Sequence, residues 1–470
     1  MNREKALIKN TIILGFGTFL PTFVSLITTP ILTGRLTNTE YGTYDLINTL
    51  VSLLLPVVTL QIQAAGFRFL ISARGDEERC KSIISNIFAV TIPAIVISAI
   101  ILYIVLHSRN IYTVFLMIAY FVIDIINSTL NQIARGFSKN KLYSIATISQ
   151  SVTKMILIFI ALELFDWGLD GVLMALTIGT LISVIVLIYS LKIWKYIRYK
   201  YLSIKVIKEL LGYSWPMVPN SLSGWFLRLS DRLVITFFLG IEQNAIYAVA
   251  NKIPNFLTTV NGTFSMAWQE NASVSADDAD ISSYYSKMYD TFWNLIAGSC
   301  GTLIAATPLL FSILIHGDYQ QAYYQMPILF IGILYSCLSS FLGGIYIANK
   351  RTKNVGITTV LAAICNITID LLTVKIIGIT AGSLSTLVSY MLLTYYRMFD
   401  LQKYQSIQYR IKKILLINFF LFLMSLLCFV NTLWTNLINI PLGIGFAIYL
   451  NVDLIKIFFN KLSYRIGIKK

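Results

Sequence analysis

Apolar runs long enough to cross a bilayer follow one another along nearly the whole chain, separated by short polar turns. A spanning helix needs about 20 predominantly apolar residues, and only helices or closed barrels satisfy their backbone hydrogen bonds inside lipid. Only 13% of the residues are charged, against about 25% in an ordinary soluble domain. We therefore predict an all-α polytopic membrane protein with fourteen spanning helices, near residues 10–34, 43–66, 82–106, 111–134, 143–165, 169–194, 211–239, 243–268, 286–315, 325–349, 354–376, 379–398, 412–431 and 436–459.

The distribution of Lys and Arg predicts which loops face the cytoplasm. Thirty of the 37 Lys and Arg residues fall in one set of loops, three fall in the opposite set, and four lie within predicted spans. Cytoplasmic loops carry the excess of basic residues, so we predict a protein of the cytoplasmic membrane with both termini in the cytoplasm. The net charge of +15 is then a topology signal and gives no reason to expect nucleic acid as a partner.

Weak internal matches divide the chain into two related halves. Both matches fall at equivalent turns of a six-helix unit, as expected for a transporter built from repeats. The matched segments are 36–48 with 239–251, and 139–140 with 353–354. We predict an N-lobe over residues 1–203 and a C-lobe over residues 204–400, related by a pseudo-two-fold axis along the membrane normal. Residues 401–470 would form a two-helix extension packed on the outside.

Three charged side chains, Arg228, Asp231 and Arg232, interrupt the seventh apolar run within little more than one helical turn. A charge at membrane depth costs about 2.5 to 3.5 kcal/mol on insertion scales, so it normally faces a wet cavity or a charged partner. This cluster is therefore the first candidate for a functional site. The alternative is that Asp231 only neutralises the two arginines and that no ligand is involved.

Charged and amide side chains in other predicted spans extend this polar character to both halves. Stripes of this kind predict a polar surface between the halves. Four cations outnumber three acids at this depth, which favours an anionic ligand. The cations are Lys154, Arg228, Arg232 and Lys252, and the acids are Asp124, Asp231 and Asp370.

Prolines in the seventh run predict a deformable helix. A proline removes a helical hydrogen bond and kinks the helix, which is tolerated in membranes where a neighbour or cavity water satisfies the backbone. Pro216 and Pro219 are followed by Gly224, so we predict a gate or hinge at these three residues. A kink that serves packing alone is the alternative.

Side chains suited to metal binding or covalent catalysis are sparse. The five cysteines have no ligand spacing, and the two histidines, His107 and His316, lie far apart. A zinc site or a His-based triad would need more of these groups, correctly spaced. We therefore predict no metal, no cofactor, no catalytic residues and no enzymatic activity.

The seventh run also carries a family resemblance. Residues 214–224, with Ser230-Asp231-Arg232, Leu239-Gly240 and residues 246–250, resemble the signature of the polysaccharide biosynthesis flippases. These form the Wzx-type branch of the multidrug/oligosaccharidyl-lipid/polysaccharide exporter superfamily. The resemblance runs from about residue 10 to 400, with supporting matches at Thr29-Pro30, Glu40-Tyr41-Gly42, Arg68, residues 316–319 and residues 348–353.

This resemblance implies two six-helix lobes around a central cationic cavity. It implies alternating access that moves an undecaprenyl-pyrophosphate-linked oligosaccharide outward for O-antigen, capsule or exopolysaccharide assembly, with a glycan polymerase and a chain-length regulator as partners. Trp215, Trp225 and Trp268 would stack on sugars or belong to the interfacial aromatic belt. The implied cavity cations are Arg228, Arg232, Lys252, Lys154 and Arg68, and the acids that would couple transport to protons or sodium are Asp124, Asp231 and Asp370.

Two other functions remain alternatives. A cation-coupled drug exporter of the same superfamily would be expected to have a more acidic cavity. A membrane glycan polymerase or glycosyltransferase needs sizeable outer loops with catalytic residues, whereas the outer loops predicted here are a few residues long. Since Asp231-Arg232 belongs to the family signature, Arg228 is the better candidate for a substrate contact specific to this chain.

Overall fold

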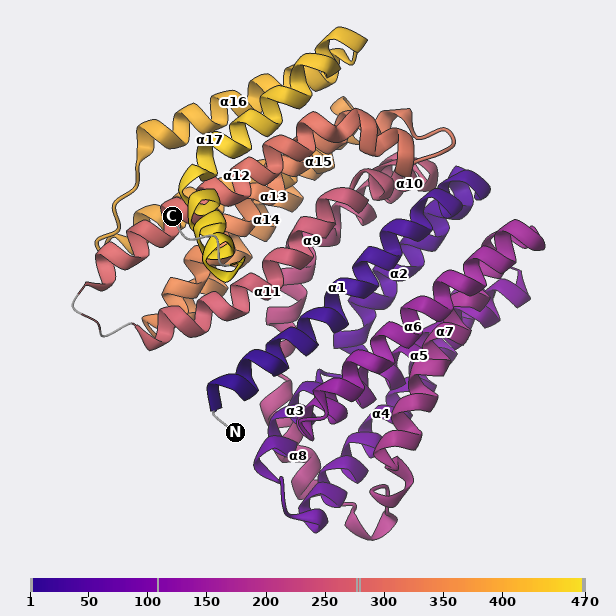
Figure 1. Ribbon diagram of the computed structural model, residues 1–470. Coiled ribbons are helices and arrows are strands. Elements are labelled where there is room, and N and C mark those ends of the chain that lie inside the picture. The colour runs from indigo at the N-terminus through magenta and orange to yellow at the C-terminus, as the bar shows by residue number, and fades with distance from the viewer. Residues whose placement is uncertain (1–2, 108–109, 276–277, 279, 467–470) are drawn as a thin grey trace. The chain divides into compact units, whose positions relative to one another are not determined.

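The computed structural model describes residues 3–107, 110–275, 278 and 280–466, and these residues form an all-α protein (Figure 1). Three short π or 3-10 turns, at Ile160–Leu164, Ile193–Lys195 and Tyr199–Tyr201, accompany the α-helices. The helices are α1 (Arg3–Arg35), α2 (Asn38–Val58), α3 (Ile62–Ser72), α4 (Glu77–Leu106), α5 (Ile111–Gly136), α6 (Asn140–Phe159), α7 (Gly168–Leu191), α8 (Ile204–Ser214), α9 (Met217–Leu239), α10 (Ile241–Ala250), α11 (Lys252–Val274), α12 (Ile281–Leu314), α13 (Gln320–Ala348), α14 (Thr352–Ile377), α15 (Thr380–Leu401), α16 (Ile411–Val430) and α17 (Leu433–Ile466).

Each of the fourteen predicted spans overlaps a helix of the structure, and the predicted all-α polytopic fold is confirmed. Within the described residues, 11 helices are both long and apolar enough to cross a membrane. The remaining predicted spans correspond to α9, α11 and α15, which have 23, 23 and 22 residues. A helix rises 1.5 Å per residue, so these three are long enough to span, and polar side chains lower their hydropathy.

The chain forms two compact units, one of Met1–Thr236 with Gly240–Ala245 and the other of Phe237–Leu239 with Ile246–Lys470. The first unit contains α1 to α8 and most of α9. The second contains the second half of α10 and then α11 to α17. The lobe limits at residues 203 and 400 stay a prediction.

Polar side chains join α5, α6 and α7 inside the first unit. Gln150 on α6 donates from Nε2 to Thr180 Oγ1 on α7, at 3.1 Å, and accepts from Asn127 Nδ2 on α5, at 3.2 Å. Ser183 on α7 donates to Asn127 Oδ1 at 2.8 Å. Buried polar groups need such partners, so Asn127 and Gln150 form a hydrogen-bonded network within this unit.

Three predicted spans are interrupted in the structure, and the one near 243–268 is divided into α10 and α11 at Asn251. The span near 43–66 is divided into α2 and α3, because Leu60 and Gln61 adopt positive φ angles of 47° and 58° between them. The span near 211–239 is divided into α8 and α9 at Trp215 and Pro216. A proline has no N–H to donate to the preceding turn, and here Pro216 occupies the N-cap position of α9.

In the second unit, α16 and α17 pack against α12, so the predicted extension is joined to the helix bundle. Lys413 on α16 forms an ion pair with Asp290 on α12 at 2.9 Å, and Arg410 lies 3.4 Å from the same carboxylate. Asn451 bends α17 and donates from Nδ2 to Asn294 O on α12 at 3.2 Å. These polar contacts join α16 to Asp290 and α17 to Asn294 of α12.

Candidate substrate site

One face of α9 carries the side chains that contact α2 and the turn before α3. Gln61 Nε2 donates to Ser221 Oγ at 2.9 Å, and Trp225 Nε1 donates to Ser52 Oγ at 2.9 Å. Arg232 Nη1 lies 2.5 Å from Asp45 Oδ1. Positions 221, 225, 228 and 232 follow the spacing of one helical face, so Arg228 lies on the same face as these three contacts.

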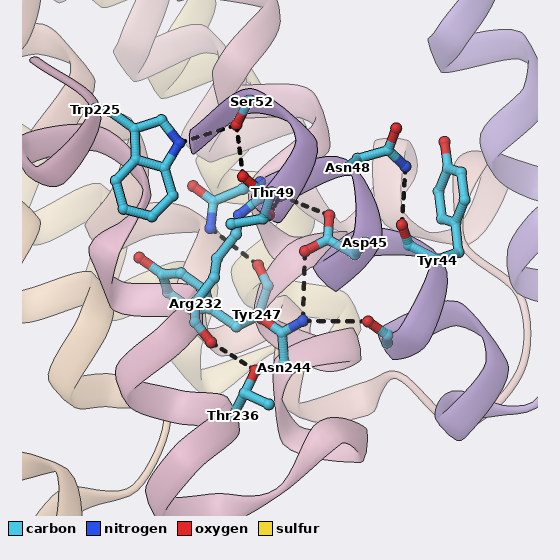
Figure 2. Close-up of polar contacts among 12 residues, drawn as sticks. Tyr44, Asp45, Asn48, Thr49, Ser52, Trp225, Arg232, Thr236, Asn244 and Tyr247 are labelled. Atoms are coloured by element: carbon cyan, nitrogen blue, oxygen red, sulfur yellow. Dashed lines mark hydrogen bonds and ion pairs between the residues drawn. The ribbon is translucent and has the colours of Figure 1, made fainter. Parts of the chain in front are cut away.

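The Arg232–Asp45 ion pair is enclosed by neutral polar groups (Figure 2). The Arg232 side chain is 13% exposed and that of Asp45 is 5% exposed. Thr49 Oγ1 lies 3.4 Å from Arg232 Nη1, and Asn244 Nδ2 lies 3.4 Å from Asp45 Oδ2. Asp45 is the ion-pair partner of Arg232, a role that the sequence alternative gave to Asp231.

Near this ion pair, the first turn of α2 meets the first turn of α10. Thr39 Oγ1 donates to Glu242 Oε1 at 2.9 Å, and Asn244 Nδ2 approaches Gly42 O at 3.4 Å. A Cβ on Gly42 would lie only 2.1 Å from the Ile241 carbonyl oxygen, so the two turns pack backbone to backbone. These two turns belong to the segments that the internal repeat relates. We call the line of contacts between α2 and α9 the α2–α9 seam, and the two turns and the ion pair lie at one end of it.

Arg228 differs from Arg232 in being exposed. No hydrogen bond or ion pair is formed by its guanidinium among the described residues, and its neighbour one turn earlier is Gly224, which leaves space beside it. An arginine on the contact face of α9 that is exposed and forms no ion pair among the described residues is accessible to a ligand. Asp231, three residues further on, is buried.

Lys154 and Asp124 form a second charged group, inside the first unit. Asp124 lies on α5 and Lys154 on α6, and Lys154 Nζ lies 5.4 Å from the centre of the Tyr120 ring. Tyr120 OH donates to Asn48 Oδ1 on α2 at 3.0 Å. The structure therefore places Lys154 in a polar network inside the first unit. Helices α2, α5 and α6 contribute side chains to this network.

The remaining predicted cations and acids lie at separate places. Arg68 is exposed on α3 and donates to Ser72 Oγ at 2.9 Å within the same helix. Lys252 is the first residue of α11, and Asp370 is fully buried in α14; both belong to the second unit. Ser385 Oγ on α15 donates to Asp370 Oδ1 at 3.0 Å.

The three predicted hinge residues lie at the start of α9. Pro216 caps the helix, and Pro219 lies in its first turn, where its carbonyl accepts from Ser223 Oγ at 2.8 Å. A Cβ on Gly224 would meet nothing closer than 3.9 Å, so close packing does not require glycine there. The break between α8 and α9 agrees with a deformable start of α9, while movement at these residues stays a prediction.

The tryptophans proposed for sugar stacking have different surroundings. Trp268 is buried, stacks on Phe341 with ring centres 4.1 Å apart, and donates to the Phe341 carbonyl. Trp225 is buried against α2, whereas Trp215 is 58% exposed at the α8–α9 break. Trp268 therefore belongs to the core of the second unit in this structure.

Sequence reasoning missed Asp45 and Asn244 as members of the site. Asp45 lies near the start of a predicted span, and nothing in the sequence connects it with an arginine 187 residues away. The signal that could have found them is the internal repeat, because both residues lie in the matched segments.

Solved structures with the same fold match between 81% and 96% of this chain. A lipid II flippase, MurJ, in an inward closed conformation matches with a TM-score of 0.73 at 16% identity, covering 96% of this chain and 99% of its own. An inward-facing multidrug resistance MATE family transporter of the MOP superfamily matches with a TM-score of 0.62 at 14% identity, covering 81% and 98%. A MOP superfamily transporter from Pyrococcus furiosus matches with a TM-score of 0.60 at 12% identity, and the match covers 86% of this chain and 96% of the transporter.

These similarities define the chain as a membrane protein with the two-lobe transporter fold shared by flippases and MATE exporters. The family model described as polysaccharide biosynthesis protein matches residues 7–269, more than half of the chain. The chain therefore belongs to the polysaccharide biosynthesis protein family, as the resemblance in the seventh span predicted. No curated protein matches the sequence.

Proposed function

We propose that this protein is a flippase that moves undecaprenyl-pyrophosphate-linked oligosaccharide repeat units outward across the cytoplasmic membrane. The product would supply a surface polysaccharide such as O-antigen, capsule or exopolysaccharide, with a glycan polymerase and a chain-length regulator as later partners. The observation that carries the proposal is Arg228, an exposed and unpaired arginine on the polar face of a membrane helix. Family membership supplies the class of cargo.

The chemistry of a pyrophosphate fits this arginine. A guanidinium binds phosphate oxygens through two parallel, charge-assisted hydrogen bonds, which are about twice as strong as neutral ones. The neighbouring Arg232 is neutralised by Asp45 in this conformation, so Arg228 is the cation that α9 offers to a ligand. Sugars would contact the polar side chains of the helices, and the lipid tail would stay in the bilayer.

Alternating access would use the contacts that now join α9 to α2. The Arg232–Asp45 pair and the Thr39–Glu242 contact hold the predicted outer end of the seam together. Release of these contacts, with bending at Pro216, Pro219 and Gly224, would open that end. Lys154, Lys252 and Arg68 would contribute positive charge along the path, and an acid such as Asp124, Asp231 or Asp370 would couple the cycle to proton or sodium entry.

To test the proposal, Arg228 variants are expressed in cells that lack the wild-type protein, and surface polysaccharide is measured. Arg228→Ala should lower surface polysaccharide about tenfold or more, because a hydrogen bond to a charged group contributes about 1.5 to 3 kcal/mol. Arg228→Lys keeps the charge but loses the bidentate geometry, so its surface polysaccharide should lie between the levels of wild type and Arg228→Ala. Arg79→Ala, at an exposed arginine outside the seam, is the matched control, and membrane content is measured by immunoblot.

The same Arg228→Ala cells distinguish a flippase from an enzyme. A blocked flippase leaves lipid-linked repeat units to accumulate on the cytoplasmic face, whereas a blocked polymerase or glycosyltransferase would not. Undiminished surface polysaccharide in Arg228→Ala would rule out the anion-binding role. Repeat units that are never assembled would favour the enzyme alternative.

A further inference from the structure

The segment between α7 and α9 combines exposed cations with exposed apolar side chains. It follows directly after Leu191, the last residue of a membrane-spanning helix, and it runs through residues 192–208 into α8. All six of its cations are exposed, and among the described residues none of them forms an ion pair. They are Lys192, Lys195, Arg198, Lys200, Lys205 and Lys208.

Large apolar side chains alternate with these cations and point outward. Tyr199 is 89% exposed and Ile204 is 74% exposed, values that are unusual for such residues in contact with water alone. Tyr189, at the end of α7, packs edge to face against Trp194, with ring centres 5.7 Å apart. Aromatic residues of this kind are enriched where a membrane meets water, because one part of the ring system is apolar and another is polar.

The backbone of this segment is held in place by α4. Ser85 Oγ donates to the Tyr196 carbonyl at 2.9 Å and accepts from the Arg198 N–H at 3.0 Å. The next residue of α4, Asn86, donates to the Tyr201 carbonyl and accepts from the Ser203 N–H, both at 2.9 Å. Two buried side chains thus fix the main chain from within, while its cations and rings remain on the outside.

The first helix after this segment has the same two-sided character. Leu210 of α8 is fully buried in the core cluster of the first unit, and Val206 and Leu211 pack against that cluster. On the other side, Ile204, Lys205 and Lys208 are exposed. A helix at the end of a span with basic and apolar residues on its outer surface is typical of the membrane interface.

We propose that residues 189–208 form a binding surface for anionic phospholipid headgroups in the leaflet where α7 ends. Unpaired cations beside a membrane attract anionic lipids, and the outward rings and aliphatic side chains enter the adjacent acyl region. Topology alone accounts for cations on this side, but it does not account for exposed rings placed among them on a fixed backbone. Since α8 leads into α9, bound lipid would hold the end of α9 that carries the predicted hinge.

The surface is tested by lipid binding, so the outcome does not depend on transport. Purified protein is titrated with phosphatidylglycerol or with phosphatidylcholine of the same chains, and bound lipid is counted by native mass spectrometry. The surface variant is Lys195→Gln/Arg198→Gln/Lys200→Gln. The control Lys350→Gln/Lys353→Gln/Lys412→Gln removes three exposed cations elsewhere on the same predicted side of the membrane.

We expect wild-type protein and the control to prefer phosphatidylglycerol, and the surface variant to lose this preference. Each cation contributes about fivefold near a membrane surface, so the three substitutions should weaken phosphatidylglycerol binding about a hundredfold. With wild-type protein, raising the salt concentration should weaken binding as well, which tests the proposal even where the variant fails to fold. Equal binding of the two lipids by wild type, or equal losses in the two variants, would overturn it.

Discussion

Charged side chains on α9 avoid the cost of membrane depth in two ways. Arg232 is paired with Asp45 and enclosed by Thr49 and Asn244. Arg228, one turn earlier on the same face, is exposed and unpaired among the described residues. A charge paired in this way stabilises one arrangement of helices, whereas an exposed, unpaired charge is available to a ligand. The two arginines therefore have different roles, although they are four residues apart.

The pairing at Arg232 predicts a large loss of stability for Asp45→Ala. Removing one partner of a buried ion pair leaves an uncompensated charge and costs about 3 to 5 kcal/mol. Thermal unfolding of the purified protein should show this loss, with the lower end expected because Arg232 is partly exposed. The double variant Asp45→Ala/Arg232→Met should recover most of it, since no buried charge then remains.

Glu163→Gln is the matched control for that measurement. It breaks the ion pair of Glu163 with Arg35, whose side chains are 26% and 48% exposed, and exposed pairs contribute at most about 1 kcal/mol. Equal losses in Asp45→Ala and Glu163→Gln would mean that Asp45 does not neutralise a buried charge.

At the scale of elements, the sequence predicted the spans better than their interruptions. Apolar runs are long and unmistakable, so each predicted span overlaps a helix. A kink is predicted at Pro216, where the structure has a break between α8 and α9. The break between α2 and α3 falls at Leu60 and Gln61, where no proline or glycine marks it. Likewise Arg228 and Arg232 were visible as charges in an apolar run, whereas Asp45 became a partner only through a contact across the fold.

The contact between the first turns of α2 and α10 predicts a cross-link that blocks transport. Thr39 and Glu242 are in hydrogen-bond contact, so a short thiol-reactive cross-linker such as a bis-methanethiosulfonate should join the cysteines of Thr39→Cys/Glu242→Cys through two disulfides, with sulfinate as the leaving group. If the two turns must separate during each cycle, the cross-link stops export of surface polysaccharide, while a cleavable reagent restores it on reduction. Each single variant, treated in the same way, should export normally. A cross-linked protein that exports at the wild-type rate would show that these turns stay together.

At the scale of the whole molecule, the fourteen predicted spans and the uneven distribution of basic residues together predict the topology. An even number of spans would place both termini on one side, and the excess of basic residues in the loops of that side predicts that it is the cytoplasm. The same assignment makes the Thr39–Glu242 contact an outer one and the 192–208 segment an inner one. Three proposals depend on this predicted topology. They are the outward direction of transport, the leaflet of the lipid-binding surface, and the end of the seam that opens to the outside.

This topology predicts opposite labelling of two exposed positions. In a Cys365→Ser background, the remaining native cysteines are buried, so a membrane-impermeant maleimide reports only on an introduced thiol. Gln320→Cys lies at the start of α13, on the predicted outer side, and should be labelled in intact cells. Lys353→Cys lies at the start of α14, on the predicted inner side, and should be labelled only after the membrane is permeabilised. Labelling in the reverse order would place the basic loops outside, and with them the proposed direction of transport would be inverted.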